Sequence, residues 1–298
     1  MLSFLPGPII GAISFLLYLV NTLFWLIPII VFSILKALIP FDFWQKIFSY
    51  LLDSMASSWV AVNTGIQRLL TRTEFQVSGL ENLTMNDWYL VVSNHQSWVD
   101  ILVLQRLLHG KIPFLKFFLK KELIFVPFLG IAWWALDFPF MKRYSSAFLK
   151  KHPQLKGKDI ETTRKACDKF KHKPVSVMNF LEGTRYTEQK HLKQKSPFNY
   201  LLKPKAGGIA FVLEAMGGHL TKIVNGTIHY PGGIPDFFSF ISGKVAKINV
   251  SIETIEIDKS IIGDYFNDDN FKLSFQQWVN QLWLDKDATI SGFTKQNN

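Results

Sequence analysis

Cysteine is almost missing from this chain. Its 298 residues contain one cysteine, Cys167, so neither an intramolecular disulfide nor a cysteine-based zinc cluster can form. Cys167 falls in a lysine-rich stretch, and we expect it to be a small packing residue on a basic helix rather than a nucleophile. The length allows one large domain or two small ones.

Charge is missing from the first part of the chain. Residues 2 to 35 carry no charged side chain, and Lys36 is the first. As one helix this block would be about 51 Å long, against about 30 Å for the hydrocarbon core of a bilayer. No basic region precedes the apolar run, which is also too long for a cleaved signal peptide. We therefore expect membrane-embedded helices over residues 1 to 40, with a buried hairpin of a soluble core as the alternative.

Polar residues and a proline interrupt this apolar block. Pro28 and the pair Asn21-Thr22 favour a break in the helix. We expect two apolar helices, roughly 9 to 26 and 29 to 39, forming a tilted span plus an interfacial segment or a re-entrant hairpin. Lys36 and Lys46 follow the block, and the positive-inside rule then places the rest of the chain in the cytoplasm.

Acidic residues are outnumbered by basic ones, which gives a net charge of +10. This balance favours an anionic partner: nucleic acid, phospholipid headgroups or phosphorylated metabolites. Residues 142 to 173 hold eleven lysines and arginines against three acidic residues. Because an apolar block precedes them and no nucleic-acid-binding module is recognisable, an anionic membrane surface fits this run better than nucleic acid.

The remaining sequence alternates between strand and helix patterns. Residues 41 to 72 predict an amphipathic connecting helix, and 73 to 298 predict one catalytic domain. Short apolar or β-branched runs indicate strands, and longer apolar or amphipathic runs indicate helices. We expect an α/β fold with a mixed, mostly parallel sheet flanked by helices. The expected strands are 74–79, 88–92, 175–180, 223–228 and 247–252, and the expected helices are 101–108, 209–216 and 271–284.

One strand-to-helix junction carries a pattern suited to proton transfer. His95 follows the strand 88–92, and Asp100 falls in the first turn of the next helix. Strand ends that feed helices are where α/β folds place chemistry. A carboxylate that fixes one imidazole nitrogen leaves the other free to accept a proton. A capping aspartate beside a structural histidine is the alternative interpretation of this spacing.

A second strand end offers groups that bind an anion. Glu182-Gly183-Thr184-Arg185 follows the strand 175–180, where glycine permits a sharp turn and arginine provides a planar fork for phosphate. Lys205 precedes a glycine-rich helix start, a second possible contact for an anion. Arg143 ends a short expected strand at residues 138 to 143.

These blocks together resemble the 1-acylglycerol-3-phosphate acyltransferase (PlsC-type) family, and they are most similar to its bacterial YihG-type branch, which is related to lysocardiolipin acyltransferases. The resemblance covers roughly residues 75 to 260. It includes the His-x4-Asp block, a block ending in Arg143, the block Phe180 to Arg185 with Leu181 where proline is usual, and a lysine loop containing Lys205.

The resemblance implies acyl transfer from acyl-CoA or acyl carrier protein to the free hydroxyl of a lysophospholipid. It implies that His95 is the general base and that Asp100 orients it. The residues implied to bind the acceptor are Arg143, Glu182, Gly183, Thr184, Arg185 and Lys205. It also implies membrane phospholipids as partners, no nucleic acid, no metal or resident cofactor, and a place at the bacterial inner membrane.

Two other functions fit the same residues. A thioesterase or phospholipase could use His95 with water, although no Gly-x-Ser-x-Gly elbow is present. A non-catalytic protein could bind membranes through the apolar helices and the basic run. A metal site is the weakest interpretation, because His95 and Asp100 have no convincing third ligand in the sequence.

Overall fold

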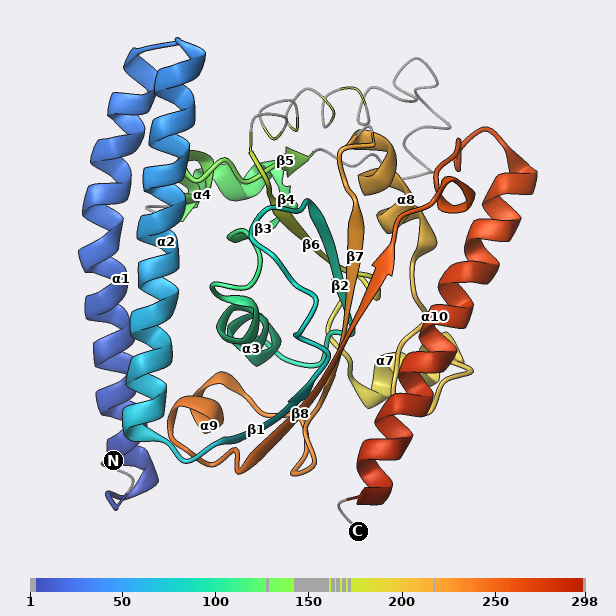
Figure 1. Ribbon diagram of the computed structural model, residues 1–298. Helices are drawn as coiled ribbons and strands as arrows, with labels where there is room; N and C mark the ends of the chain where they lie inside the picture. The colour runs from blue at the N-terminus through green and yellow to red at the C-terminus, as the bar shows by residue number, and fades with distance from the viewer. Residues whose placement is uncertain are drawn as a thin grey trace.

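The computed structural model describes residues 4–126, 129–141, 173–216 and 218–296, together with positions 161, 164, 167 and 170. A long helical hairpin stands beside an α/β unit (Figure 1). Arg143 and most of the basic run from 142 to 172 lie outside the described residues. Cys167 is buried in the core, as expected for a packing residue.

The apolar block forms one helix, so the expected break at Pro28 is wrong. Helix α1 runs from Gly7 to Leu38 with Pro28 inside it. A proline removes one helical hydrogen bond, and here the partner helix α2 (Asp42–Leu70) packs beside α1 and supports it. The hairpin therefore turns at residues 39 to 41.

The polar residues that suggested a break instead join the two helices. The Asn21 side chain is buried, and its Nδ2 donates to Trp59 O at 3.0 Å and to Asn63 Oδ1 at 2.8 Å. The Trp59 indole donates to Thr22 Oγ1 at 3.1 Å. A buried amide needs such partners, so these polar positions fix how α1 and α2 pack.

The central sheet confirms the expected α/β class. Its six strands have the order β1-β8-β7-β2-β6-β3, and each neighbouring pair is parallel except β7–β8, which is antiparallel. The five residues of β2 are all buried, as their uninterrupted apolar sequence predicts for a central parallel strand. The strands are β1 (Glu74–Ser78), β2 (Tyr89–Ser93), β3 (Leu115–Phe117), β6 (Ser176–Phe180), β7 (Lys222–His229) and β8 (Lys247–Glu256). A separate two-stranded sheet pairs β4 (Leu119–Lys120) with β5 (Phe140–Met141).

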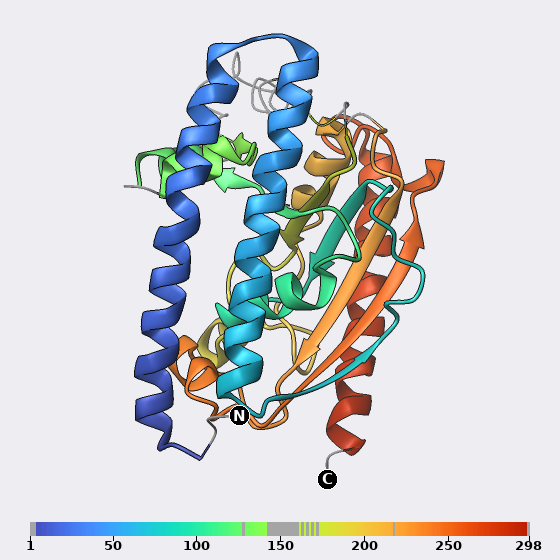
Figure 2. The same cartoon turned by 60° about the vertical axis from the view of Figure 1, so that its left-hand side comes forward.

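Helices cover both faces of the sheet. Helix α3 (Val99–Leu108) lies between the sheet and the hairpin (Figure 2), while α8 (Ala206–Ala215) and α10 (Asp269–Gln296) cover the other face. Successive residues of β2 alternate between these layers, with Leu90 and Val92 packed in one core and Tyr89 and Val91 in the other. Shorter helices are η1 (Lys121–Phe125), α4 (Leu129–Ala135), α7 (Glu188–Gln194), α9 (Phe237–Ile241) and η4 (Lys259–Ile261).

Strand direction determines where the chemistry can gather. Because β2 is parallel to both β6 and β7, the carboxyl ends of these three strands share one edge of the sheet. Ser93 aligns with Phe180 on one side and with Gly226 on the other. The segments that follow these strands therefore begin side by side.

Candidate active site

His95 and Asp100 form a direct pair at the carboxyl edge of the sheet. His95 Nδ1 lies 2.9 Å from Asp100 Oδ2. The histidine side chain is 13% exposed and the aspartate is fully buried. With Nδ1 engaged by a carboxylate, Nε2 is the nitrogen left to accept a proton.

The local backbone explains why these residues meet. Asp100 Oδ2 also accepts the backbone N–H groups of Gln96 at 2.6 Å and Ser97 at 2.8 Å. The carboxylate thus closes the loop before α3 and lies near the positive end of that helix. The expected alternative, a capping aspartate, is not what the structure shows, because Asp100 accepts from the loop before α3 and Trp98 at the start of that helix provides no side-chain cap.

Tyr230 holds the other oxygen of the same carboxylate. Its hydroxyl donates to Asp100 Oδ1 at 2.6 Å, and its side chain is buried. Burial raises the pKa of Tyr230 well above its usual range, and the Asp100 charge raises it further, so the phenol keeps the proton that it donates. Tyr230 could not be identified from the sequence, because it is one aromatic residue after a buried strand, without a distinctive pattern around it.

An asparagine locks the segment that carries Tyr230 against the histidine loop. Asn94 Nδ2 donates to Ile228 O at 2.9 Å, and Ile228 N donates to Asn94 Oδ1 at 2.9 Å. This amide therefore makes a strand-like pair of hydrogen bonds just past the end of β2. It fixes the distance between the strands that supply His95 and Tyr230.

The Glu182–Arg185 segment lies directly beside His95. The ring of Phe180 stacks on the imidazole, with centroids 3.8 Å apart and planes 13° from parallel. Tyr186 N donates to His95 O at 2.7 Å. The two motifs lie far apart in the sequence but form one unit, because β2 and β6 are neighbouring parallel strands.

Glu182 is the most unusual group in this segment. Its side chain is fully buried, and no described residue forms a hydrogen bond of good geometry with either carboxylate oxygen. Burial raises the pKa of Glu182 well above its ordinary value, although the backbone amide of His95 opposes this effect. The described residues therefore leave the hydrogen-bonding capacity of this buried carboxylate unused.

Cations surround the exposed part of the same segment. Gly183 has a φ of +66°, and a Cβ there would come within 3.0 Å of Lys205 Nζ, so Lys205 lies against this turn. The Arg185 guanidinium lies 4.7 Å from the centre of the Trp98 ring. Lys190, which no sequence motif indicated, donates to Thr184 Oγ1 at 2.8 Å and to Arg185 O at 2.9 Å.

These cations give the segment after β6 a positive charge, which is suited to an anion. Lys190, Lys205 and Arg185 approach one short segment within reach of the His95 loop. Within the described ranges, no three histidine, cysteine, aspartate or glutamate side chains gather as a metal site would require. Arg143, also expected to bind the acceptor, lies outside those ranges.

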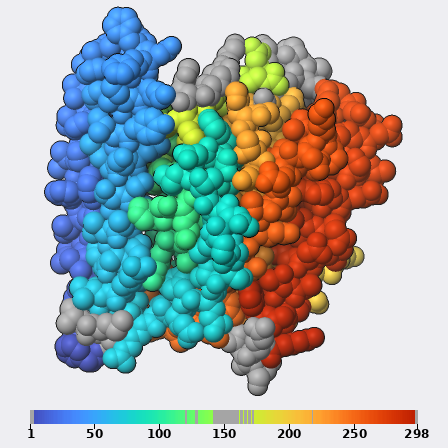
Figure 3. Space-filling view, in the orientation of Figure 1, coloured from blue at the N-terminus to red at the C-terminus, as the bar shows by residue number. Residues whose placement is uncertain are grey.

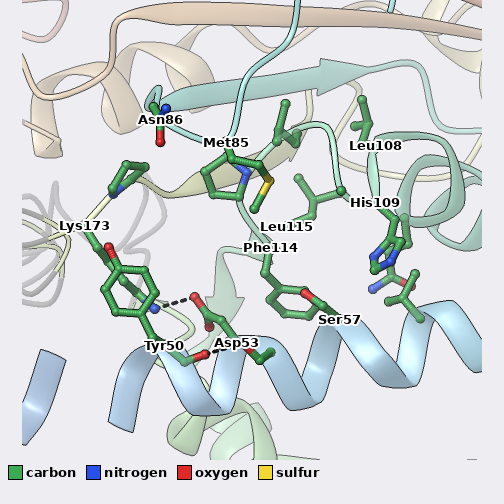
Figure 4. Close-up of a pocket in the computed structure, with 17 residues that line it drawn as sticks. Tyr50, Asp53, Ser57, Met85, Asn86, Leu108, His109, Phe114, Leu115 and Lys173 are labelled. Carbon is green, nitrogen blue, oxygen red and sulfur yellow. Dashed lines mark hydrogen bonds and ion pairs between the residues drawn. The ribbon is translucent and has the colours of Figure 1, made fainter. Parts of the chain in front are cut away.

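A second polar cluster lies at the opposite edge of the sheet. A cavity of about 450 Å³ opens between α2 and the segments that lead into β2, β3 and β6 (Figure 4). At its side, Asp53 of α2 accepts from Lys116 Nζ at 2.9 Å and from Lys173 Nζ. Burial, together with the Lys116 charge, lowers the pKa of Lys173 to about 8. This cluster joins the hairpin to the sheet and lies away from His95.

Comparisons with known proteins find that this chain is similar to acyltransferases. A 1-acyl-sn-glycerol-3-phosphate acyltransferase gamma of Mus musculus is 26% identical over 212 residues, covering 67% of this chain and 51% of that protein. A 2-acyl-1-lysophosphatidylinositol acyltransferase of Saccharomyces cerevisiae is 23% identical over 250 residues, covering 68% of this chain and 61% of that protein. The chain spans about half the length of relatives such as the mouse protein.

A solved structure shows the same fold. The crystal structure of the 1-acyl-sn-glycerophosphate (LPA) acyltransferase PlsC from Thermotoga maritima aligns with a TM-score of 0.55 at 15% identity, covering 96% of this chain and 97% of that one. Residues 74–231 of this chain match the Acyltransferase family, and they include His95, Asp100, the Glu182–Arg185 segment and Tyr230. This match covers more than half of the sequence, and the chain therefore belongs to the Acyltransferase family.

Proposed function

We propose that this protein transfers a fatty acyl group from acyl-CoA or acyl carrier protein to the free hydroxyl of a lysophospholipid, such as lysophosphatidate. The observation that carries this proposal is the His95–Asp100 pair, with Nε2 available beside a cluster of cations. The names of the relatives, all acyltransferases of acylglycerol phosphates or lysophospholipids, support the same reaction.

The reaction needs a base and a positioned acceptor. His95 Nε2 removes the proton of the acceptor hydroxyl as its oxygen attacks the thioester carbonyl. The tetrahedral intermediate collapses with loss of the thiolate, which takes the proton back from His95. Asp100, fixed by Tyr230 and two backbone amides, holds the ring and stabilises the imidazolium. A thioester is already activated, so the proposal includes no resident cofactor and no acyl-enzyme.

The cations beside Gly183 are suited to the acceptor phosphate. Arg185 offers two parallel donors, and Lys205 offers a mobile ammonium group. Since Lys190 already bonds to Thr184 and to the Arg185 carbonyl, it orders this segment. We propose Arg143 as a further phosphate contact from its motif alone. The assignment to the bacterial YihG-type branch also depends on the sequence motifs.

The hairpin supplies a surface for lipid. Helix α1 is long and apolar enough to cross a bilayer, and its side chains Phe24 and Ile27 are 64% and 67% exposed. Near its start α1 contacts Phe238 of α9, and near its end Lys36 pairs with Asp137. Both ends of α1 thus lie against the part of the protein outside the hairpin, along one flank of the molecule (Figure 3).

This placement favours a hairpin that lies in one membrane surface over a helix that projects away from the domain. A crossing α1 would carry the α/β unit into the bilayer with it. We therefore propose interfacial binding, with the cytoplasmic orientation resting on Lys36 and Lys46.

Vesicle binding tests the hairpin proposal. Phe24→Lys with Ile27→Lys should weaken co-sedimentation with anionic phospholipid vesicles, because two apolar contacts are replaced by charges that must stay in water. Leu192→Lys, which changes an equally exposed residue on α7, is the matched control. Equal binding by both variants would exclude α1 as the lipid contact.

Product analysis tests the reaction. Purified protein is given labelled acyl-CoA or acyl carrier protein and a panel of lysophospholipids, and the lipids are separated. Diacyl phospholipid that depends on His95 supports the proposal. Free fatty acid without diacyl product would indicate the thioesterase or phospholipase alternative. No product from any acceptor, with intact vesicle binding, would support the non-catalytic alternative.

A further inference from the structure

A lysine of the C-terminal helix is buried behind the carboxyl edge of the sheet. Lys286 of α10 is 1% exposed. Its Nζ donates to Asn225 Oδ1 at 2.7 Å, to Gly226 O at 2.6 Å and to Thr227 Oγ1 at 3.1 Å. An ammonium group has three N–H donors, and these three acceptors match them, so the geometry fits the charged form.

A buried ammonium group needs a compensating charge, because burial alone strongly disfavours an isolated ion. Burial lowers the pKa of Lys286 to about 7, while the carboxylates of Glu182 and Glu253 raise it. Glu253 is exposed and is reached through Asn225, whose Nδ2 donates to its Oε2 at 3.0 Å. Glu182 is fully buried and lacks a hydrogen bond of good geometry with any described residue.

The strands place this lysine next to both halves of the site. Gly226, whose carbonyl Lys286 binds, aligns with Ser93 at the end of β2, and Ser93 aligns with Phe180 at the end of β6. Glu182 follows the end of β6. The same segment of β7 continues to Tyr230, which holds Asp100. Helix α10 packs against β7 on the side of the sheet away from the hairpin (Figure 1).

We propose that Lys286 is a positioning residue for the acyl-transfer site: it places a buried donor group that can carry positive charge behind the buried Glu182 carboxylate, and it fixes the end of β7 that leads to Tyr230. This inference rests on the proposed function. An ionised Glu182 attracts the backbone amides of His95 and Leu202, which holds its segment against the histidine. Protonation of Glu182 weakens this attraction and lets Phe180 and the cationic segment move relative to His95.

The two roles of Lys286 can be separated by a double-mutant cycle. Lys286→Met keeps the length and apolar stem but removes the charge and the donors. Glu182→Gln keeps the shape but removes the opposite charge. The two single variants and the combined variant are compared with wild type in kcat, in the pH profile of kcat/KM and in Tm. Lys272→Met, on an exposed part of the same helix, is the control.

We expect K286M to lower kcat by roughly 10- to 100-fold, the scale of a small displacement at a catalytic group. The acid limb of its pH profile should move to higher pH, because Glu182 loses a charge that lowers its pKa. In the E182Q background the same lysine substitution should cost less in both kcat and Tm. Equal losses in both backgrounds with an unmoved acid limb would overturn the proposal.

A variant that fails to fold still gives an answer. If K286M alone cannot be purified, the combined variant should fold, because the uncompensated buried carboxylate is then removed. Failure of the combined variant to fold better than K286M would also overturn the proposal. The Tm cycle does not depend on activity, so it decides the Lys286–Glu182 coupling even if wild type transfers no acyl group and the proposed function fails.

Discussion

The two edges of the sheet both bury charged groups, but they arrange them differently. At the edge facing α2, Asp53 uses one oxygen for Lys116 and the other for Lys173. At the carboxyl edge, Glu182 has no described hydrogen bond of good geometry, and His95 uses one nitrogen for Asp100. Burial of charge therefore does not identify the site. What distinguishes the site is that the buried carboxylate of Glu182, without a described hydrogen bond, lies near the partly exposed His95.

The largest contrast should come from replacing one histidine at each edge. His95→Ala should lower kcat/KM by about 10²–10⁴-fold, the usual contribution of a general base. His109→Ala, which changes an exposed histidine beside the remote cavity, should leave the rate unchanged. Steady-state assays with labelled acyl-CoA measure both. A folded His95→Ala enzyme with normal turnover would remove the assignment of this edge as catalytic.

Substitutions at the edge facing α2 should lower the free energy of unfolding and leave the turnover rate unchanged. Asp53→Ala leaves Lys116 and Lys173 without their shared carboxylate, and removing one partner of a buried ionic group costs about 3–5 kcal/mol. Urea unfolding measures the loss, and the rate per folded molecule at low temperature should equal that of wild type. A lowered rate in the folded fraction would show that this edge communicates with the site.

The pH dependence of stability should reveal the lysine at this edge. The pKa of Lys173 is lowered to about 8 in the fold, whereas an unfolded chain has the ordinary value of 10.5. Between these two values the unfolded state binds more protons, so the unfolding free energy rises with pH, by about 3 kcal/mol in total. Below pH 8 the cost of burying the charge is fully present. The difference between wild type and Lys173→Met should follow this curve, and a flat difference would refute it.

A smaller effect is expected from the tyrosine that holds Asp100. Tyr230→Phe removes one hydrogen bond to a charged group, which is worth about 1.5–3 kcal/mol. If the bond serves mainly to position the base, kcat should fall about tenfold or more, while KM for the lysophospholipid stays near its wild-type value. A rise in KM with normal kcat would instead place Tyr230 in substrate binding.

The smallest effect is expected at the exposed arginine. Arg185→Ala should raise KM for a phosphate-bearing acceptor by about fivefold, because an exposed ion pair contributes up to about 1 kcal/mol. Arg185→Lys should recover part of this loss, since it keeps the charge but not the planar fork. An unchanged KM in the alanine variant would leave Lys205 as the main phosphate contact.

The sequence predicted those parts of the molecule that depend on local pattern. Apolar runs that end in His95 and in the Glu182–Arg185 segment indicated strand ends, and parallel pairing then brought the two motifs together. The His-x4-Asp spacing predicted a contact that the helical turn after Ser97 makes possible.

Other features depend on contacts that no local pattern records. Tyr230 and Lys286 act through side chains that meet residues far away in the sequence. The break expected at Pro28 failed for the same reason, because helix α2 supports α1 and uses Asn21 as a contact.

The hydrogen bonds from Lys286 to the end of β7 have a consequence for synthesis in the cell. The ribosome synthesises His95 and Asp100 long before α10 emerges. If α10 must dock before Glu182 is held in place, a nascent chain that already contacts the membrane has an incomplete active site. Activity would then begin only after α10 has been translated.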